Sequence, residues 1–278
     1  MMLFKTTRGL LVQRGKEYFC LPGADWDQLF REQQPVDLIA RKLRGWAPVA
    51  DGAALLRRGL LPPIGRQEVW GAGITYYRSR DARMEEARAA GSGDFYARVY
   101  EAERPELFFK ATPHRVSGHG EKVRIRADAK WNVPEPELTA AVNAAGRVFG
   151  YTIGNDVCSR DIEAVNPLYL PQAKVYDGSC ALGPGLLLAE GPLPQSMAIT
   201  LQVLRRGKTV FRGATELAKL KRAPEVLAQW LCRECSFPDG CYLLTGTGIV
   251  PPDEFTLRHG DEIRIAMDGL GVLVNKVA

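Results

Sequence analysis

The spacing of apolar residues separates the first part of the chain from the rest. Two short apolar runs within residues 10–20 predict a small hairpin. Apolar residues at helical spacing follow over residues 25–46, and Pro35 must divide that segment into two helices because proline breaks a helix interior. Residues 61–64, Leu-Pro-Pro-Ile, predict an extended linker. We therefore expect a small N-terminal α/β domain over residues 1–64.

Short apolar strands and glycine-containing turns dominate residues 65–278. Residues 78–90, rich in Ala, Arg and Glu, predict a helix. Residues 224–235 predict a second, longer helix, and Pro224 stands where the missing N–H of a first helical residue costs nothing. The predicted strands lie at residues 69–74, 107–110, 123–126, 137–143, 148–153, 186–188, 199–204 and 263–265. Many short strands and few helices predict an α+β, β-rich fold, with the sheet rolled or closed into a barrel.

Composition narrows the classes of protein. Hydrophobic residues make up 46% of the 278 residues, which is enough for a large core without disulfides. The net charge of +5 is scattered, and no block of like charges predicts a nucleic-acid-binding arm. No stretch approaches the roughly 18 apolar residues of a membrane span, and no signal peptide is evident at the N-terminus. We expect a cytoplasmic protein that binds neither nucleic acid nor membranes.

The six cysteines are expected to be reduced thiols in that compartment. Cys232 and Cys235 have the C-x-x-C spacing of some zinc and redox sites, but Cys241 and His259 do not complete a standard ligand set. The alternative is a pair of thiols packed at the end of a helix.

A Pro-Glu-Pro-Glu segment carries the first candidate chemistry. Its two prolines exclude a helix interior, and in an extended chain Glu135 and Glu137 point the same way. Two like charges so close repel unless a cation lies between them. Pro136 cannot donate a backbone hydrogen bond, so we expect this segment at the edge of a sheet. A chance Glu-x-Glu, as at residues 101–103, is the alternative.

Asp156 adds a third carboxylate. It follows the apolar run at residues 148–153, which predicts a buried strand, and an acid just past such a strand is either a site residue or a turn or helix cap. Together with Glu135 and Glu137, and with no His or Cys nearby, it forms a hard oxygen site. Such a site favours Mg²⁺, with Mn²⁺ or Ca²⁺ as substitutes, over zinc. Three protein ligands leave coordination positions for water and a bidentate substrate.

These residues belong to a longer pattern that resembles the fumarylacetoacetate hydrolase family over roughly residues 65–278. The pattern comprises Pro-Glu-Pro-Glu-Leu at 134–138, Gly-Tyr-Thr-Ile-Gly-Asn-Asp-Val-Cys-Ser-Arg-Asp at 150–161, Lys174, Leu-Gly-Pro at 182–184 and Thr-Gly-Thr-Gly at 245–248. The resemblance implies a fumarylacetoacetate hydrolase-like β-roll in which Mg²⁺ binds the carboxylate and 2-oxo group of a small anionic 2-oxo acid. It also implies a homodimer or homotetramer.

Hydrolases of that family carry a His and a Glu shortly after the strand that corresponds to residues 71–74. Ser79 and Ala82 stand at the matching positions here, and neither side chain is a base near neutral pH. Fold alone does not name the reaction, so this departure matters.

Residues 104–110 and 166–176 are similar to the 2-keto-3-deoxy sugar-acid dehydratases of the family. Cys158 and residues 164–165 depart from what is usual in that branch, and both departures bear on the sugar acid accepted. The resemblance implies dehydration of a 2-dehydro-3-deoxy sugar acid, such as 2-dehydro-3-deoxy-D-arabinonate, to 2,5-dioxopentanoate.

By the same resemblance, Lys174 and Glu106 are the acid–base pair. Lys174 would remove a proton from C3, with its pKa lowered by partial burial and a nearby divalent cation. Glu106 would protonate the departing C4 hydroxyl, which requires a raised pKa. The alternatives are a counter-ion for the acidic cluster in the case of Lys174, and a surface acid in the case of Glu106.

Four further residues are candidate substrate contacts. Thr247, in a glycine-rich turn, is expected to hold a substrate carboxylate, unless the turn is purely structural. Arg160 is expected to pair with Asp161 or with the substrate, and Tyr76 and Ser79 are expected to contact sugar hydroxyls.

Three rival functions stay open from the sequence. A C–C hydrolase of acylpyruvates needs a His–Glu pair beside the metal, and an oxaloacetate decarboxylase-like enzyme needs less acid–base equipment. A non-catalytic metal-binding scaffold would have no pocket beside Lys174.

Overall fold

The largest element of the molecule is a ten-stranded mixed sheet. The computed structural model describes residues 1–78, 95–189 and 191–278. The sheet has the strand order β3-β2-β1-β12-β10-β9-β15-β4-β5, and β6 pairs with β12 at its side. Its strands are β1 Met2–Thr6, β2 Gly9–Arg14, β3 Glu17–Leu21, β4 Glu68–Gly73, β5 Glu106–Ala111, β6 Val116–Ser117, β9 Pro136–Val142, β10 Val148–Asp156, β12 Cys180–Leu188 and β15 Cys241–Leu244.

A five-stranded sheet packs against one face of the large sheet. Its order is β14-β13-β16-β17-β7, and a two-stranded ladder, β11-β8, lies beside it. The bounds are β7 Lys122–Val123, β8 Asn132–Val133, β11 Cys158–Ser159, β13 Ala198–Arg205, β14 Lys208–Glu216, β16 Glu262–Met267 and β17 Gly271–Val277. Alternate side chains of β9 and β10 meet those of β13, β16 and β17 in one continuous apolar core. The predicted β-rich α+β fold is therefore confirmed.

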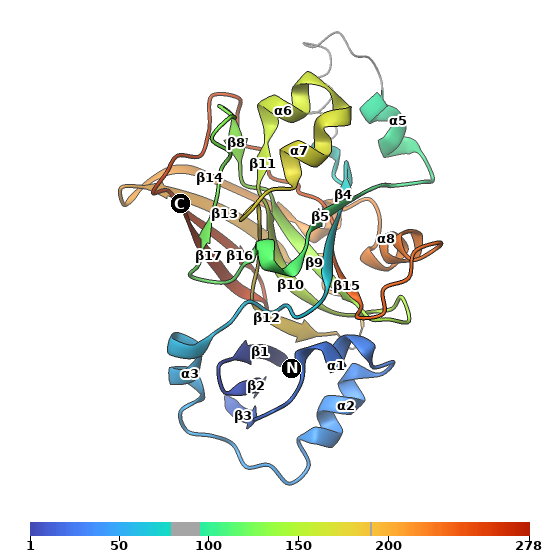
Figure 1. The fold of residues 1–278 in the computed structure, drawn as a ribbon, viewed down its shortest axis with the longest axis vertical. Helices are drawn as coiled ribbons and strands as arrows, with labels where there is room; N and C mark the ends of the chain where they lie inside the picture. The colour runs from blue at the N-terminus through green and yellow to red at the C-terminus, as the bar shows by residue number, and fades with distance from the viewer. Residues whose placement is uncertain (79–94, 190) are drawn as a thin grey trace.

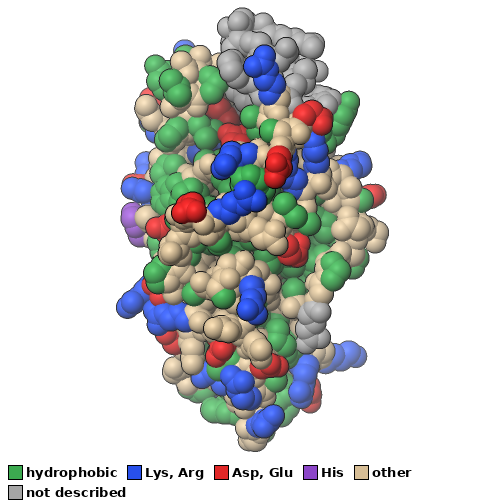
Figure 2. Space-filling view, turned by 90° about the vertical axis from the view of Figure 1, so that its right-hand side faces the viewer, with side chains coloured by type: hydrophobic (Ala, Val, Ile, Leu, Met, Phe, Trp, Pro, Cys, Tyr) green, Lys and Arg blue, Asp and Glu red, His purple; other side chains and the backbone are tan. Residues whose placement is uncertain are grey.

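Few helices surround these sheets. They are α1 Trp26–Arg31, α2 Pro35–Lys42, α3 Gly52–Gly59, α5 Phe95–Glu101, α6 Arg160–Val165, α7 Leu170–Lys174 and α8 Pro224–Leu231, with 3₁₀ turns η1 Pro113–Arg115, η2 Pro167–Tyr169 and η3 Leu217–Lys219. In Figure 1, α6 and α7 lie at one end of the molecule, near β4 and β5, and residues 1–60 lie at the other end. On the face in Figure 2, acidic and basic side chains are interspersed, in agreement with the scattered charge.

The N-terminal elements are built as predicted but share the large sheet. The β2–β3 hairpin forms, and α2 begins at Pro35, which separates it from α1. Strand β1 pairs with β12 through Met2 and Leu3, and Phe30 of α1 lies edge-on against Phe149 and Tyr242, with ring centroids 5.0 Å apart in each case. The predicted domain boundary at residue 64 stays a prediction, and apolar packing crosses it.

Several predicted boundaries were wrong. Strand β10 continues through Asp156, so this residue ends the strand instead of following it. Helix α8 stops at Leu231, because residues 233–236 after it are exposed and have no apolar face to pack. Of the strand predicted at residues 123–126, only Val123 lies in β7. Apart from Arg78, the helix predicted at residues 78–90 lies outside the described residues.

Candidate active site

Three carboxylates meet where β9 begins and β10 ends. Ligand oxygens of Glu135, Glu137 and Asp156 lie within 4.8 Å of one another, and all three side chains are buried. Antiparallel pairing places Asp156 beside Glu135, whose carbonyl accepts a 2.9 Å hydrogen bond from the Asp156 N–H. Glu135 and Glu137 then share a side because they are two residues apart in an extended chain. The local geometry is the one predicted from the Pro-Glu-Pro-Glu segment.

The expected edge location of this segment was wrong. Strand β9 runs between β10 and β15 in the middle of the large sheet. Pro136 is tolerated because it is the first residue of the strand, one of the few positions in a sheet where a missing N–H does no harm. Asn155 supports Glu135, the residue before Pro136, because the Asn155 Oδ1 accepts a 3.2 Å hydrogen bond from the Glu135 N–H.

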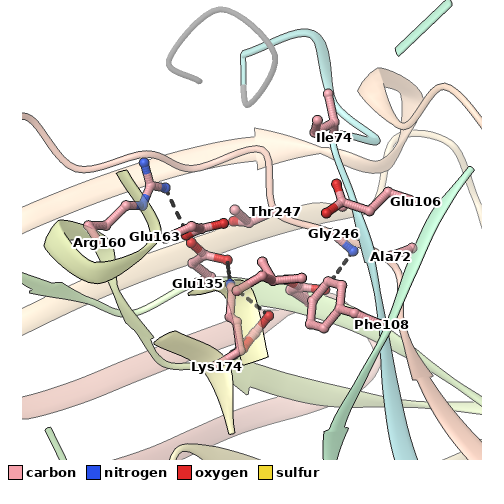
Figure 3. Close-up of a pocket in the computed structure, with 14 residues that line it drawn as sticks. Ala72, Ile74, Glu106, Phe108, Glu135, Arg160, Glu163, Lys174, Gly246 and Thr247 are labelled. Atoms are coloured by element: carbon pink, nitrogen blue, oxygen red, sulfur yellow. Dashed lines mark hydrogen bonds and ion pairs between the residues drawn. The ribbon is translucent and has the colours of Figure 1, made fainter. Parts of the chain in front are cut away.

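Three buried cations surround the carboxylates. Lys174 Nζ lies 2.6 Å from Glu135 Oε2 and 2.9 Å from Asp156 Oδ2, and it comes from the last turn of α7. Arg160, at the start of α6, pairs with Glu135 at 3.2 Å, so its predicted protein partner, Asp161, is replaced by Glu135. Lys110 of β5 is fully buried and lies 2.5 Å from Asp156 Oδ1. Figure 3 shows Arg160 and Lys174 directed at Glu135.

The electrostatics of the cluster favour a bound cation. Burial raises the pKa of the Glu137 carboxyl well above its ordinary value, and the neighbouring charges of Asp156 and Glu135 raise it further. The Gly246 N–H opposes this shift by donating a 2.5 Å hydrogen bond to Glu137 Oε2. Since the ionised form of Glu137 is disfavoured without a cation, and all three ligands are hard oxygen donors, the residues fit Mg²⁺.

The lowering predicted for the Lys174 pKa presupposes a bound divalent cation, and in the protein without one the shift has the opposite direction. Burial lowers the pKa of this ammonium, but the negative charges of Asp156 and Glu135 raise it by more, so the pKa lies well above its ordinary value. The prediction counted burial and a metal ion but not the carboxylates that lie closer. In this state Lys174 is a cation that occupies the middle of the acidic cluster.

A cavity opens beside the cluster, and seven of the nine predicted site residues line it. They are Glu106, Glu135, Glu137, Asp156, Arg160, Lys174 and Thr247. Tyr76 is buried and lines a neighbouring cavity, where burial and the nearby Glu137 raise its pKa. Ser79 lies outside the described residues. The roles assigned to these residues from sequence stay predictions.

Two charged residues of the site were not predicted. Lys110 donates to the backbone carbonyls of Val157 and Lys174, at 3.0 and 2.6 Å, and so ties the end of β10 to the end of α7. Its signal was a lysine at the end of the apolar run Leu-Phe-Phe of β5. Glu163 of α6 lines the cavity and accepts a 2.9 Å hydrogen bond from the Cys158 thiol. Its sequence carries no such signal.

The C-x-x-C pair is not part of a metal site. Cys232 caps the end of α8 and is half-buried, Cys235 is exposed, and both are free thiols. Within residues 1–78, 95–189 and 191–278, Glu135, Glu137 and Asp156 are the one group of His, Cys, Asp or Glu side chains that converges closely enough to ligate an ion. The alternative of thiols at a helix end is therefore the one observed.

Comparison with known proteins assigns this architecture. Residues 75–278 match the family described as fumarylacetoacetate (FAA) hydrolase, C-terminal. The chain belongs to the fumarylacetoacetate hydrolase family. That assignment confirms the resemblance of the sequence motifs, and it places Glu135, Glu137, Asp156 and Lys174 in the matched part of the chain.

Two curated members of the family are particularly similar. The 2-dehydro-3-deoxy-D-arabinonate dehydratase of Saccharolobus solfataricus is 45% identical over 217 residues, which cover 77% of this chain and 73% of the relative. The probable 2-keto-3-deoxyxylonate dehydratase of Haloferax volcanii is 41% identical over 243 residues, which cover 87% and 82%. Both names describe hydro-lyases of sugar acids.

A solved structure of a similar enzyme contains a bound metal ion. The structure of a 2-keto-3-deoxy-D-arabinonate dehydratase complexed with magnesium and 2,5-dioxopentanoate superposes with a TM-score of 0.82 at 35% identity, covering all of this chain and 98% of the other. The same enzyme without ligand superposes with a TM-score of 0.85 at 36% identity, with equal coverage. Mg²⁺ is therefore the cofactor that family likeness and the acidic cluster both support.

Proposed function

We propose that this protein is a Mg²⁺-dependent hydro-lyase that dehydrates a 2-dehydro-3-deoxy sugar acid, such as 2-dehydro-3-deoxy-D-arabinonate, to 2,5-dioxopentanoate. One observation carries the proposal: Lys174 and Glu106, which the resemblance to the dehydratases pairs as base and acid, line the same cavity as the three carboxylates. The dehydratase names of the similar proteins support the same reaction.

Glu135, Glu137 and Asp156 would hold the ion. When bound, Mg²⁺ supplies Lewis-acid polarisation of the 2-oxo group, which acidifies the adjacent C3 protons. The charge balance suits a divalent ion: with Glu106 protonated as the acid and Lys174 neutral as the base, the other four carboxylates that line the cavity outnumber Lys110 and Arg160 by two.

Lys174 accepts the C3 proton at Nζ. Its ammonium form is held by Glu135 and Asp156, so it becomes a base once those carboxylates are neutralised by another cation. Tethering of the Lys174 carbonyl by Lys110 keeps the end of α7 against the site while the side chain moves. The ion pairs with Glu135 and Asp156 thus hold the Lys174 side chain in place before it accepts the proton.

Glu106 donates a proton to the C4 hydroxyl, which leaves as water. The C3=C4 enone that remains becomes 2,5-dioxopentanoate once one hydrogen of C5 and the C5 hydroxyl hydrogen shift to C3 and C4. In Figure 3 its carboxylate enters the cavity from β5, while Lys174 enters from α7. The two groups therefore act from different sides of a substrate between them, as removal of a proton and a hydroxyl from adjacent carbons requires. Thr247 and Arg160 also line the cavity, and in this proposal they bind substrate oxygens.

A second function, C–C hydrolysis of an acylpyruvate, has weaker support. It needs a histidine base, and His114, His119 and His259, the three histidines of the chain, are exposed and absent from the lining of this cavity. A purely structural metal site is also disfavoured, because a cavity opens beside Lys174.

We expect a homodimer or homotetramer in the cytoplasm. No helix of the described residues is both long and apolar enough to cross a membrane.

The experiment that tests the proposal is incubation of the purified protein and Mg²⁺ with a panel of 2-keto-3-deoxy sugar acids, acylpyruvates and oxaloacetate, with products identified by mass. We expect loss of one water from at least one sugar acid. Cleavage of an acylpyruvate into two fragments would establish the hydrolase, and release of carbon dioxide from oxaloacetate alone would establish a decarboxylase.

A further inference from the structure

Strand β4 carries two glycines directly opposite two cavity-lining residues of β5. Gly73 faces Glu106 and Gly71 faces Phe108 in the antiparallel register. Directly opposed residues on neighbouring strands have adjacent side chains on the same face of the sheet. Glu106 and Phe108 both line the cavity, as does Gly73 itself.

The Glu106 carboxyl group occupies the volume where a side chain on Gly73 would begin. A Cβ built on Gly73 would lie 2.6 Å from Glu106 Cδ and 3.3 Å from its Cγ, and it would overlap Oε2. Real Cβ atoms do not approach other atoms so closely, so a side chain at this position forces the carboxylate to move. The φ angle of Gly73 is not positive, and its backbone therefore accepts any residue. Glycine is needed here for space and not for backbone conformation.

The same relation recurs one pleat away. A Cβ on Gly71 would lie 2.5 Å from Cζ of Phe108. The Phe108 ring faces Lys174, whose Nζ lies 5.7 Å from the ring centroid. Strand β4 thus leaves room for the acid and for the aromatic wall beside the base, and Figure 3 shows Glu106 and Phe108 on the β4 side of the cavity.

We propose that Gly73 is a positioning residue for Glu106, and that Gly71 has the same relation to Phe108. Because Gly73 has no side chain, the Glu106 carboxyl group can lie over the β4 backbone and point into the cavity. This inference rests on the proposed function, in which Glu106 delivers the proton to the leaving hydroxyl. It explains two glycines inside a strand, where glycine otherwise weakens the structure.

The test compares Gly73→Ala with wild type. The overlapping atoms are the far end of a flexible side chain, so Glu106 swings aside and the fold is kept. We expect kcat to fall about 10-fold or more, a part of the 10²–10⁴ that a general acid contributes, with little change in KM. The Mg²⁺ affinity by calorimetry stays unchanged. Gly191→Ala is the matched control, because a Cβ there meets nothing within 4 Å.

A double-mutant cycle shows whether the effect passes through Glu106. In a Glu106→Ala background the overlap is gone, so adding Gly73→Ala leaves the residual kcat and the melting temperature unchanged. Wild-type kcat in Gly73→Ala, with Glu106→Ala inactive, overturns the positioning role but leaves the proposed function standing. Full activity of Glu106→Ala overturns the acid assignment itself.

The cycle also decides the matter if Gly73→Ala alone does not fold. Stability restored in the Gly73→Ala/Glu106→Ala protein locates the overlap at the Glu106 side chain and supports the inference. A double variant as unstable as Gly73→Ala contradicts it, because the clash then lies elsewhere.

Discussion

Two regions of the large sheet are held together by opposite kinds of chemistry. Where α1 and α2 cover it, Phe30, Phe149 and Tyr242 pack edge to face in a fully apolar cluster. At the cavity, Glu135, Glu137 and Asp156 are buried with like charges beside one another. Burial favours the first group and opposes the second.

The difference separates stability from function. Apolar burial stabilises the fold whatever the ionic conditions, whereas buried carboxylates are tolerated only with partners. Lys110, Lys174 and Arg160 are those partners in the protein without an ion. A site that needs three cations to be tolerated is also one that an added divalent ion rearranges. Variants in the aromatic cluster and in the carboxylate site should therefore change different measurements.

The largest effect is expected for Lys174→Ala. Removing the base should lower kcat by about 10³-fold or more, near the upper range for general base catalysis. Mg²⁺ affinity should be kept or improved, because Glu135 and Asp156 lose a competing cation. Steady-state kinetics and calorimetry check the two parts. Lys208→Ala, at an exposed lysine, is the control and should behave as wild type. Turnover retained in Lys174→Ala would refute its role.

In the apolar cluster under α1 and α2, Phe30→Ala should destabilise the fold without changing the metal site. Deleting a fully buried aromatic ring typically lowers the free energy of unfolding by about 3–5 kcal/mol. Mg²⁺ affinity of the remaining folded protein should be unchanged. Denaturant unfolding and calorimetry provide the measurements, and Trp46→Ala, at a ring 47% exposed, should cost little. A large loss of Mg²⁺ affinity in Phe30→Ala would show that the two regions are coupled.

The smallest effect is a pH dependence of Mg²⁺ binding. The raised pKa of Glu137 means that the ion must displace a proton below that pKa, so affinity should fall by up to about tenfold per pH unit as the pH decreases. The sign for the ion-free fold is opposite. Because the pKa of Glu137 is higher in the folded protein than in the unfolded one, the folded protein binds more protons between these two pKa values. The free energy of unfolding therefore falls as the pH rises from the unfolded-state pKa toward the folded-state pKa.

Calorimetry from about pH 8 down to the lowest pH at which the protein stays folded measures the affinity part of that prediction. Glu137→Gln serves as the control for the stability part: without the titrating group, the ion-free protein should lose this decline in melting temperature. A pH-independent Mg²⁺ affinity over the same range would contradict the shift.

Local rules predicted the features that depend on a few neighbouring residues. Pro35 dividing two helices and Glu135 and Glu137 sharing a side both follow from backbone geometry. The central position of β9 was not predictable, because strand order depends on contacts distant in sequence. Lys110 and Gly73 were missed for the same reason: their meaning lies in which residues oppose them.

Strand order has a consequence for how new reactions arise on this scaffold. The ion ligands sit on β9 and β10, at the centre of the sheet, whereas Glu106 sits on β5, the last strand in the sheet order of the described residues. A peripheral strand tolerates sequence change better than one flanked on both sides. Redesign of β5 should therefore alter which bond is broken while the carboxylates of β9 and β10 keep their capacity to hold the ion.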